Sequence, residues 1–201
     1  MSWTLAACLL SVSAAQAADV YTYWIQPCSA QIAERSGCET DDPELARWAL
    51  EAWERTAQPG LHFVPASNED LARIRIYWLG KQPELYGDTR MMLVDGRRAA
   101  AIRVHPDLTE FGPEIAGAGK RDRLFRDAVV YLTCLHESGH AIGLLHTADF
   151  EDIMYSFQYG GDVLEYFSRY RRNLKERADI RGHTGISAED GRKAAALYAE
   201  K

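Results

Sequence analysis

The stretch HESGHAIGLLH, residues 136–146, holds three histidines and one glutamate close together in the chain. Few turn-forming residues interrupt the surrounding run, residues 122–142, before Gly143. Apolar residues recur through this run at the spacing that places them on one face of a helix: Leu124, Val129, Leu132, Leu135 and Ile142. The sequence therefore predicts a long helix that begins near Asp122 and carries the first two histidines.

His136 and His140 are four residues apart, so on a helix their rings project from one face. They are separated by about one turn, roughly 6 Å along the axis. Two imidazoles at this spacing can bind one tetrahedral zinc ion at nitrogen-to-metal distances of about 2.1 Å. Glu137 points in a different direction and stays off the metal, where it can act on a water molecule. We predict that Glu137 is the general base, and later the general acid, of a hydrolytic reaction.

His146 would face away from the other two histidines if the helix continued, because six residues correspond to about 600° of rotation. Gly143 changes this, since a residue without a Cβ adopts positive φ angles and can end the helix and turn the chain back. Three neutral imidazoles then leave one coordination position for water, as in a catalytic zinc site. The sequence predicts one zinc ion bound by His136, His140 and His146, and peptide hydrolysis by activated water.

The same residues leave other functions open. A zinc-containing module could bind peptides without cleaving them, although the intact Glu137 argues against this alternative. A zinc hydrolase of cell-wall peptides would share every catalytic residue and differ only in its substrate. HExxH alone is a short pattern that also occurs by chance. The longer HExxHxxGxxH gives each fixed position a mechanical reason and favours a metalloendopeptidase.

With this motif the chain resembles the metzincin zinc endopeptidases, which pair HExxHxxGxxH with a downstream methionine turn. The corresponding residue is Met154, in EDIMYSF. Thr147, the run VVYLTCLHESGHAIGLLH and the closing SAEDGRKAAALYAE make the chain most similar to the matrixins, the matrix metalloproteinase-like catalytic domains. The resemblance implies an α+β fold with a twisted, mixed five-stranded sheet, two long helices and a C-terminal helix. It also implies that Met154 forms the floor beneath one catalytic zinc.

Parts of the chain depart from the matrixin pattern. Ser156 stands where matrixins usually have proline, two residues after the turn methionine, so we expect a different pocket wall. Residues 160–182 look like an insertion before the final helix. We find no motif for a structural zinc or for calcium, so a second metal is not predicted, while calcium binding is left open. The resemblance further implies that the strand near residues 98–104 is the cleft edge, along which a peptide or protein substrate binds in extended form.

Strand and helix patterns also occur outside the histidine run. Asp95-Gly96 is a dipeptide typical of a tight hairpin turn. Asp42 is expected to cap a helix with Pro43 in its first turn. We find no linker and predict one domain, residues 19–201. The predicted strands cover residues 20–26, 61–64, 72–79 and 90–104, and the further helices cover residues 41–56, 162–180 and 187–200.

The N-terminal segment, residues 1–18, carries no charge and is rich in Leu, Ala and Val, which is typical of a secretion signal. Ala15-Gln16-Ala17 offers the small-x-small pattern of a cleavage site. We therefore predict a signal peptide at residues 1–18 and a secreted or periplasmic protein. Beyond it, no stretch approaches the roughly 18 apolar residues of a membrane span, so no transmembrane segment is expected.

The cysteines and the charge narrow the class further. In an exported protein, Cys28 and Cys38 on either side of a polar segment predict a disulfide. Cys134 lies in an apolar run and predicts a buried, inert thiol. The formal net charge of −6 argues against nucleic-acid binding, which needs a concentrated basic face. We expect the protein to act as a monomer.

Overall fold

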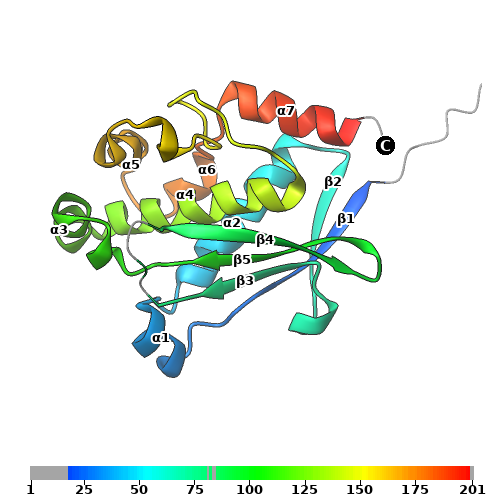
Figure 1. Ribbon diagram of the computed structural model, residues 1–201, viewed down its shortest axis with the longest axis horizontal. Coiled ribbons are helices and arrows are strands. Elements are labelled where there is room, and N and C mark those ends of the chain that lie inside the picture. The colour runs from blue at the N-terminus through cyan, green and yellow to red at the C-terminus, as the bar shows by residue number, and fades with distance from the viewer. Residues whose placement is uncertain (1–17, 81, 83–84, 200–201) are drawn as a thin grey trace, which may run out of the picture.

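The computed structural model describes residues 18–80, 82 and 85–199, and the predicted signal peptide lies outside them except for its last residue. The fold is α+β, with a five-stranded sheet in the order β2-β1-β3-β5-β4 (Figure 1). Every neighbouring pair is parallel except β4 and β5. This architecture confirms the predicted mixed sheet and is compatible with a metzincin-like fold. The strands are β1 (Asp19–Ile25), β2 (Leu61–Pro65), β3 (Ile74–Trp78), β4 (Gly87–Val94) and β5 (Arg97–Val104).

Two long helices, α2 (Asp42–Thr56) and α4 (Arg123–Ile142), pack against each other over the sheet (Figure 1). α4 covers β4 and β5, while α2 covers β1 and β2. Trp53 is fully buried between them and donates a hydrogen bond of 2.9 Å from Nε1 to the carbonyl oxygen of Leu135. The remaining helices are α1 (Ala30–Ser36), α3 (Pro113–Arg121), α5 (Val163–Arg171), α6 (Asp179–Gly182) and α7 (Ala188–Ala199), with short 3-10 turns at Glu69–Leu71, Leu108–Glu110 and Phe157–Tyr159.

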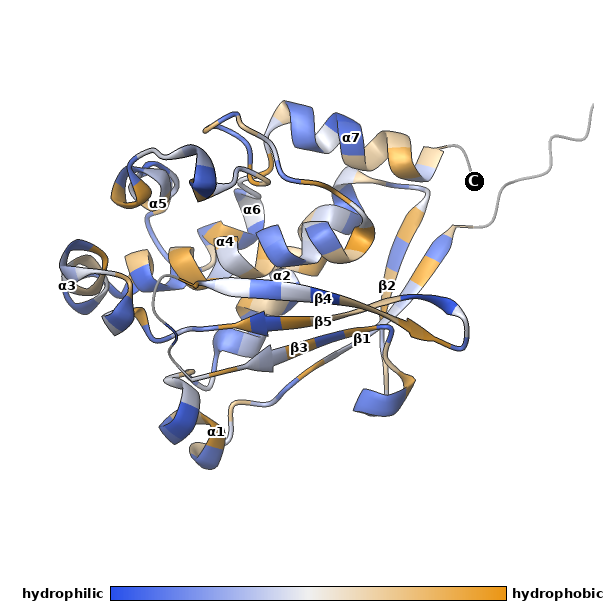
Figure 2. Ribbon diagram, viewed as in Figure 1, coloured by the Kyte–Doolittle hydropathy of each residue, from blue (hydrophilic) through white to orange (hydrophobic). Residues whose placement is uncertain are grey.

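The strands alternate between buried and exposed side chains, which fixes the face that meets the helices. In β3, Ile74, Ile76 and Trp78 are buried, and the residues between them are half-buried. β5 continues this face with Ile102 and Val104. Figure 2 shows the same alternation as hydrophobic and hydrophilic segments along the strands. The period of two that predicted these strands is therefore confirmed.

β2 and β4 are the two edge strands of the sheet, and β4 is the edge strand that α4 contacts. The expectation that residues 98–104, in β5, form the cleft edge is therefore wrong. β5 pairs on one side with β3, from Ile74↔Ala100 onward, and on the other side with β4. The hairpin at Asp95 and Gly96, both at positive φ as a tight turn requires, brings β4 back along the free side of β5. The edge position therefore belongs to the first strand of this hairpin.

The helix predicted over residues 162–180 is interrupted. α5 ends at Arg171, and turns lead from there to the short α6. Arg177, in this interval, reaches back to the amino-terminal end of α2, where Nη2 donates to the carbonyl oxygen of Asp41 at 2.7 Å. Its guanidinium carbon also lies 5.1 Å from the ring centre of Trp48. These long-range contacts compete with continued helix and explain the break.

Three further features of the helices differ from the expectations. No helix is predicted in the polar segment between Cys28 and Cys38, but it contains α1, because Ser29 caps the start of this helix and Gly37 ends it in the left-handed conformation. The disulfide between the two cysteines is confirmed. No helix is predicted at residues 113–121, where α3 lies. Asp42 is not the cap of α2; Asp41 holds that position, and Asp42 lies fully buried inside the first turn.

The last helix agrees with its expected start, because the backbone N–H of Asp190 donates to Oγ of Ser187 at 3.0 Å. Among the described residues, no helix combines the length and the apolar character that crossing a membrane requires.

Candidate metal centre

The turn at the end of α4 carries the third histidine toward the first two. Gly143 has a φ of 113° and ends the helix in the left-handed region, where glycine is favoured. Its N–H donates to the carbonyl oxygens of Gly139 and His140, and the N–H of Leu144 donates to Gly139 at 2.9 Å. These bonds satisfy carbonyl groups that a helix end leaves unpaired. The chain then reverses, as the sequence predicted from Gly143, and His146 returns to the side of the first two histidines.

The three histidines place their Nε2 atoms close together. Nε2 of His146 lies 3.2 Å from Nε2 of His136 and 3.0 Å from Nε2 of His140. Nδ1 of His136 lies 2.7 Å from the carbonyl oxygen of Ile153, and Nδ1 of His140 lies 2.9 Å from that of Leu144. A carbonyl only accepts, so Nδ1 carries the proton in both rings and Nε2 presents a lone pair.

This donor set fits a tetrahedral metal ion. Ligands at about 2.1 Å from zinc stand roughly 3.4 Å apart, which is close to the observed separations between Nε2 atoms. One potential ligand atom from each of the three histidines lies within 4.8 Å of the others. Burial, followed by the neighbouring His140, lowers the pKa of His136 to about 3. Burial also lowers the pKa of His140 and of His146, so all three rings stay neutral, as metal ligation requires.

Glu137 is a buried carboxyl group beside the histidines, with only 6% of the residue exposed. Its Oε2 accepts a hydrogen bond of 2.8 Å from the hydroxyl of Thr89 on β4, which also lies 2.9 Å from the Glu137 carbonyl oxygen. Burial raises the pKa of Glu137 to about 7, and Asp88 adds to this shift while the Thr89 hydrogen bond opposes it. The carboxyl group is therefore able to take up or release a proton near neutral pH.

Met154 packs tightly against α4. A Cβ built on Gly139 would lie 2.4 Å from the Met154 sulfur, so only glycine fits there without a shift. The backbone of Met154 is held on both sides: its N–H donates to Oδ2 of Asp190 at 3.0 Å, and its carbonyl accepts from Thr147 at 2.9 Å. These contacts bring the predicted methionine turn under the histidine helix. They also join this turn to α7.

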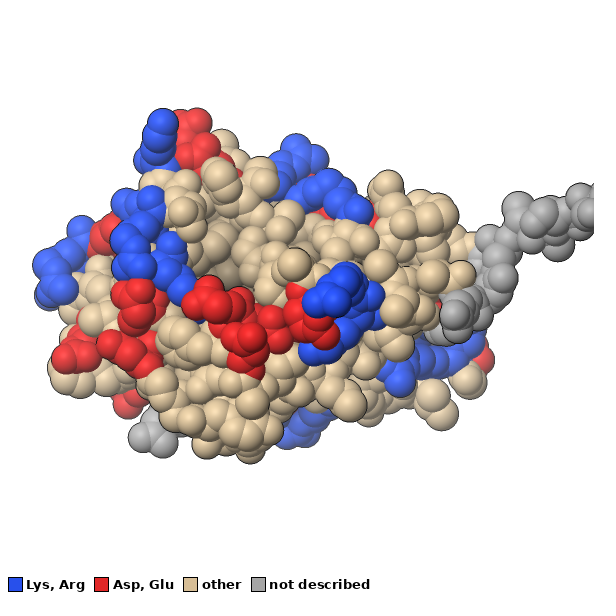
Figure 3. Space-filling model, turned by 90° about the horizontal axis from the view of Figure 1, so that it is seen from above, with Lys and Arg blue, Asp and Glu red and all other residues tan. Residues whose placement is uncertain are grey.

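A cavity of about 420 Å³ opens beside Glu137 and the histidines. Its walls come from the beginning of β4, from α4, from the segment after Met154 and from α5. Figure 3 looks onto this face, where uncharged side chains form the hollowed centre and charged side chains surround it. Ser156 lies in the wall, where a difference from the matrixin pattern was expected. Five of the lining residues are aromatic: Tyr86, Tyr155, Phe157, Tyr166 and Phe167.

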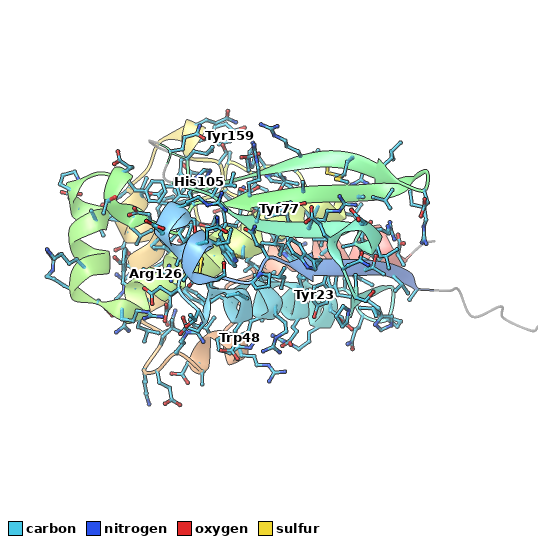
Figure 4. The ribbon with its side chains drawn as sticks, turned by 90° about the horizontal axis from the view of Figure 1, so that it is seen from below. Tyr23, Trp48, Tyr77, His105, Arg126 and Tyr159 are labelled. Atoms are coloured by element: carbon cyan, nitrogen blue, oxygen red, sulfur yellow. A yellow bond between two sulfur atoms is a disulfide. The ribbon has the colours of Figure 1, made fainter. Side chains whose placement is uncertain are left out.

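Histidines outside the motif have other surroundings. Nδ1 of His62 lies 3.0 Å from Oε1 of Glu54. His105 is buried at the end of β5 with Nδ1 against the carbonyl oxygen of Gly80 (Figure 4). His183 is exposed. Among the described residues, only the three motif histidines group as potential ligands of a metal.

The sequence did not predict the contacts of Thr89 with Glu137 and of Asp190 with Met154. Thr89 is 48 residues away from Glu137, and Asp190 is 36 residues away from Met154. No local pattern marks either contact. Cys134, by contrast, is buried as expected, and burial raises the pKa of its thiol.

Comparison with known proteins relates the chain to metalloproteinases. No protein-family model matches it. A protein of Trichoplusia ni ascovirus 2c, named "Putative matrix metalloproteinase", is 31% identical to the chain over 137 residues. The similar region covers 59% of this chain and 25% of that protein, so the chain spans about a quarter of its relative's length. The similarity agrees with a cluster of three potential metal ligands.

Proposed function

We propose that the chain is a zinc-dependent metalloendopeptidase of the metzincin type, most similar to the matrixin catalytic domains. The observation that carries this proposal is the convergence of three histidine Nε2 atoms beside the buried carboxyl group of Glu137, at the wall of a cavity. The similarity to a protein named as a matrix metalloproteinase supports the same class.

In this proposal His136, His140 and His146 hold the zinc ion through Nε2. A bound zinc supplies Lewis acidity, which polarises a peptide carbonyl and makes water more acidic. Glu137 accepts the proton of the attacking water on its carboxylate and then donates it to the leaving amine. Burial raises the pKa of Glu137 to about 7, which suits both steps because a proton carrier works best near the operating pH.

The proposed substrate is a peptide or protein segment in extended form. The free edge of β4 offers backbone groups to which such a segment can add as a further strand. The cavity of about 420 Å³ then receives one of its side chains. We further propose that the protein works outside the cytoplasm, because the disulfide between Cys28 and Cys38 forms and persists in an oxidising compartment.

The direct test is digestion of unfolded casein by the zinc-loaded protein, with and without a chelator. We expect fragments that disappear on chelation and return when zinc is restored. Glu137→Ala should retain one zinc per chain and lose hydrolysis by about 10³-fold, because it removes the proton carrier and leaves the ligands. Glu114→Ala, an exposed glutamate at the start of α3, is the matched control and should cleave like the wild type.

Three other outcomes would contradict this proposal in different ways. Hydrolysis at the wild-type rate by Glu137→Ala would rule out the proposed mechanism. Zinc-dependent binding of peptides without any cleavage would favour a binding module. Cleavage of peptidoglycan cross-links with no action on casein would favour a cell-wall hydrolase.

A further inference from the structure

A second cavity, of about 340 Å³, lies further along β4 than the first. It shares Thr89 and His140 with the larger cavity, so the two adjoin along the edge strand. We call it the Arg98 pocket, because Arg98 is the permanently charged side chain among its lining residues. Its lining residues are Thr89, Met91, Arg98, His140, Gly143, Leu144 and Leu145.

Arg98 brings a positive charge to the inner face of the hairpin. In the register of the hairpin, Arg98 lies opposite Leu93 of β4. Its side chain has the same orientation as those of Ala100 and Ile102, which are buried on the inner face. Its Nη1 lies 2.8 Å from the position that a Cβ on Gly143 would take. Within residues 18–80, 82 and 85–199, the guanidinium forms neither an ion pair nor a hydrogen bond.

Part of this placement has a structural cause. The carboxyl end of α4 carries a partial negative charge, which attracts a cation to the Gly143 turn. That attraction holds the guanidinium in position and leaves its N–H donors available, since none of them is used by the described residues. A guanidinium with free donors is well suited to bind a carboxylate.

The rest of the pocket is apolar and open to solvent. Met91 is 49% exposed and Leu145 is 81% exposed, although both are large hydrophobic residues. Apolar walls around one cation match a side chain that has an aliphatic stem and a negative end. Glutamate fits this description best, and aspartate has the same end on a shorter stem.

The pocket has a defined position relative to the scissile bond. Thr89 contacts Glu137 and marks the reacting centre, and Met91 lies two residues further along β4, about 6.8 Å away. Antiparallel pairing is the commoner arrangement for an added strand. A peptide antiparallel to β4 then places the residues before its scissile bond at Met91 and Arg98.

We propose that Arg98 is a specificity-determining residue, which selects substrates with glutamate or aspartate roughly two or three residues before the scissile bond. This inference rests on the proposed peptidase function and adds a preference to it.

The first test uses peptides built on a mapped cleavage site. For each of the two positions, two and three residues before the scissile bond, three peptides are compared that differ only in carrying Glu, Gln or Lys there. The wild type should cleave the Glu peptide with a kcat/KM about fivefold above that of the Gln peptide, the size expected for one partly exposed ion pair. The Lys peptide should be cleaved more slowly still. Raising the ionic strength should reduce the preference, because salt screens exposed charges. Equal rates for Glu and Gln would overturn the proposal.

Two variants assign the preference to one side chain. Arg98→Ala should cleave the Glu and Gln peptides at similar rates, and Arg98→Lys should retain part of the preference. Arg97→Ala, with the same loss of charge at the neighbouring position on the opposite face of β5, is the matched control and should behave like the wild type. A preference that survives in Arg98→Ala would overturn the proposal. Thermal unfolding of each variant separates this effect from a loss of stability at the helix end.

A binding assay separates this proposal from the proposed function. Fluorescence anisotropy of the labelled peptides with zinc-loaded Glu137→Ala measures affinity without turnover. We expect about fivefold tighter binding of the Glu peptide, which is lost when Arg98→Ala is added. If the wild type cleaves no peptide and this binding difference is still found, the peptidase function is contradicted and the Arg98 pocket is supported. If peptides are cleaved and neither rate nor affinity depends on Arg98, the function stands and the pocket fails.

Discussion

The two halves of α4 bury polar side chains in different ways. In the amino-terminal half, Arg126 is 7% exposed and binds Asp42, a fully buried residue of α2. Two hydrogen bonds join the guanidinium to that carboxylate, and the one from Nη2 is 2.7 Å long. The next residue, Asp127, is 1% exposed and contacts Arg123 and Arg177. Each of these buried charges faces an opposite charge.

The carboxyl-terminal half buries ionisable groups without that compensation. Glu137 accepts a hydrogen bond from Thr89, and no Lys or Arg pairs with it among the described residues. His136 and His140 are kept neutral by burial, which lowers the pKa of each ring. Buried groups with strongly shifted pKa values beside a cavity are typical of functional sites. One helix thus combines a neutralised structural end with an end whose polar groups remain available for a ligand.

The largest effect is expected when a charge is removed from the amino-terminal half of α4, where buried charges are paired. Arg126→Ala leaves the Asp42 carboxylate buried without its positively charged partner, although the backbone N–H of Glu39 still donates to it. Removing one member of a buried ion pair costs about 3 to 5 kcal/mol. Urea unfolding should report this loss in the free energy of unfolding. The control is Arg192→Ala, whose side chain is 77% exposed and pairs with that of Glu189, 43% exposed, and which should cost about 1 kcal/mol or less. Equal losses in the two variants would contradict the contrast between buried and exposed pairs.

The same contrast explains what the sequence could predict. The candidate metal centre could be located from the sequence because its three histidines, Glu137 and Gly143 lie within one short stretch with helical spacing. The ion pair between Arg126 and Asp42 could not be predicted, because the two residues are 84 positions apart and no local pattern links them. The local pattern instead predicts that Asp42 is a helix cap, which is the usual role of aspartate just before a helix.

Errors in the fold have the same origin. Periodicity located the strands and both long helices, since it follows from which face is buried. It could not decide which strand of the β4–β5 hairpin lies at the edge, because either order gives the same alternation. The break after Arg171 depends on Arg177 reaching α2, a contact between residues more than a hundred positions apart.

The next effect, of similar size, concerns the functional end. A metal that binds only the folded protein raises the free energy of unfolding by about 3 to 4 kcal/mol at 100 to 1,000 times its dissociation constant. Adding zinc to the chelator-treated protein should therefore raise the unfolding midpoint in urea. His140→Ala should abolish most of this gain, and His62→Ala, outside the cluster, should leave it unchanged. An identical zinc response in both variants would contradict metal binding by the three histidines.

A third effect measures the cost of burying Glu137 without a cation. Its pKa is raised by burial to about 7 in the folded protein, so the folded state binds this proton more tightly than the unfolded state. The wild type should therefore lose stability through this group as the pH rises from the unfolded value of about 4.5 toward 7, by about 3 kcal/mol in total. The motif histidines, whose pKa values are lowered, oppose this trend, but they are common to the wild type and to Glu137→Gln.

The difference between these two proteins isolates the carboxyl group. In metal-free buffer, Glu137→Gln should match the wild type at pH 4 and exceed its free energy of unfolding by about 3 kcal/mol at pH 8. Urea unfolding at several pH values provides the measurement. If the difference in the free energy of unfolding stayed constant with pH, the negative charge of Glu137 would be compensated in the folded protein, contrary to this prediction.

The smallest effect tests the hydrogen bond that the Thr89 hydroxyl donates to the Glu137 carboxylate. Thr89→Val keeps the shape of the side chain and removes the hydroxyl, at a cost of about 1 kcal/mol. Because the bond favours the ionised carboxylate, the loss should be larger at pH 8 than at pH 5. Thr133→Val is the matched control, since the Thr133 hydroxyl donates to the carbonyl oxygen of Val129 and not to Glu137. Its cost should not change over this pH range, and a pH-dependent cost in both variants would assign the effect to the cavity as a whole and not to the Thr89 hydrogen bond.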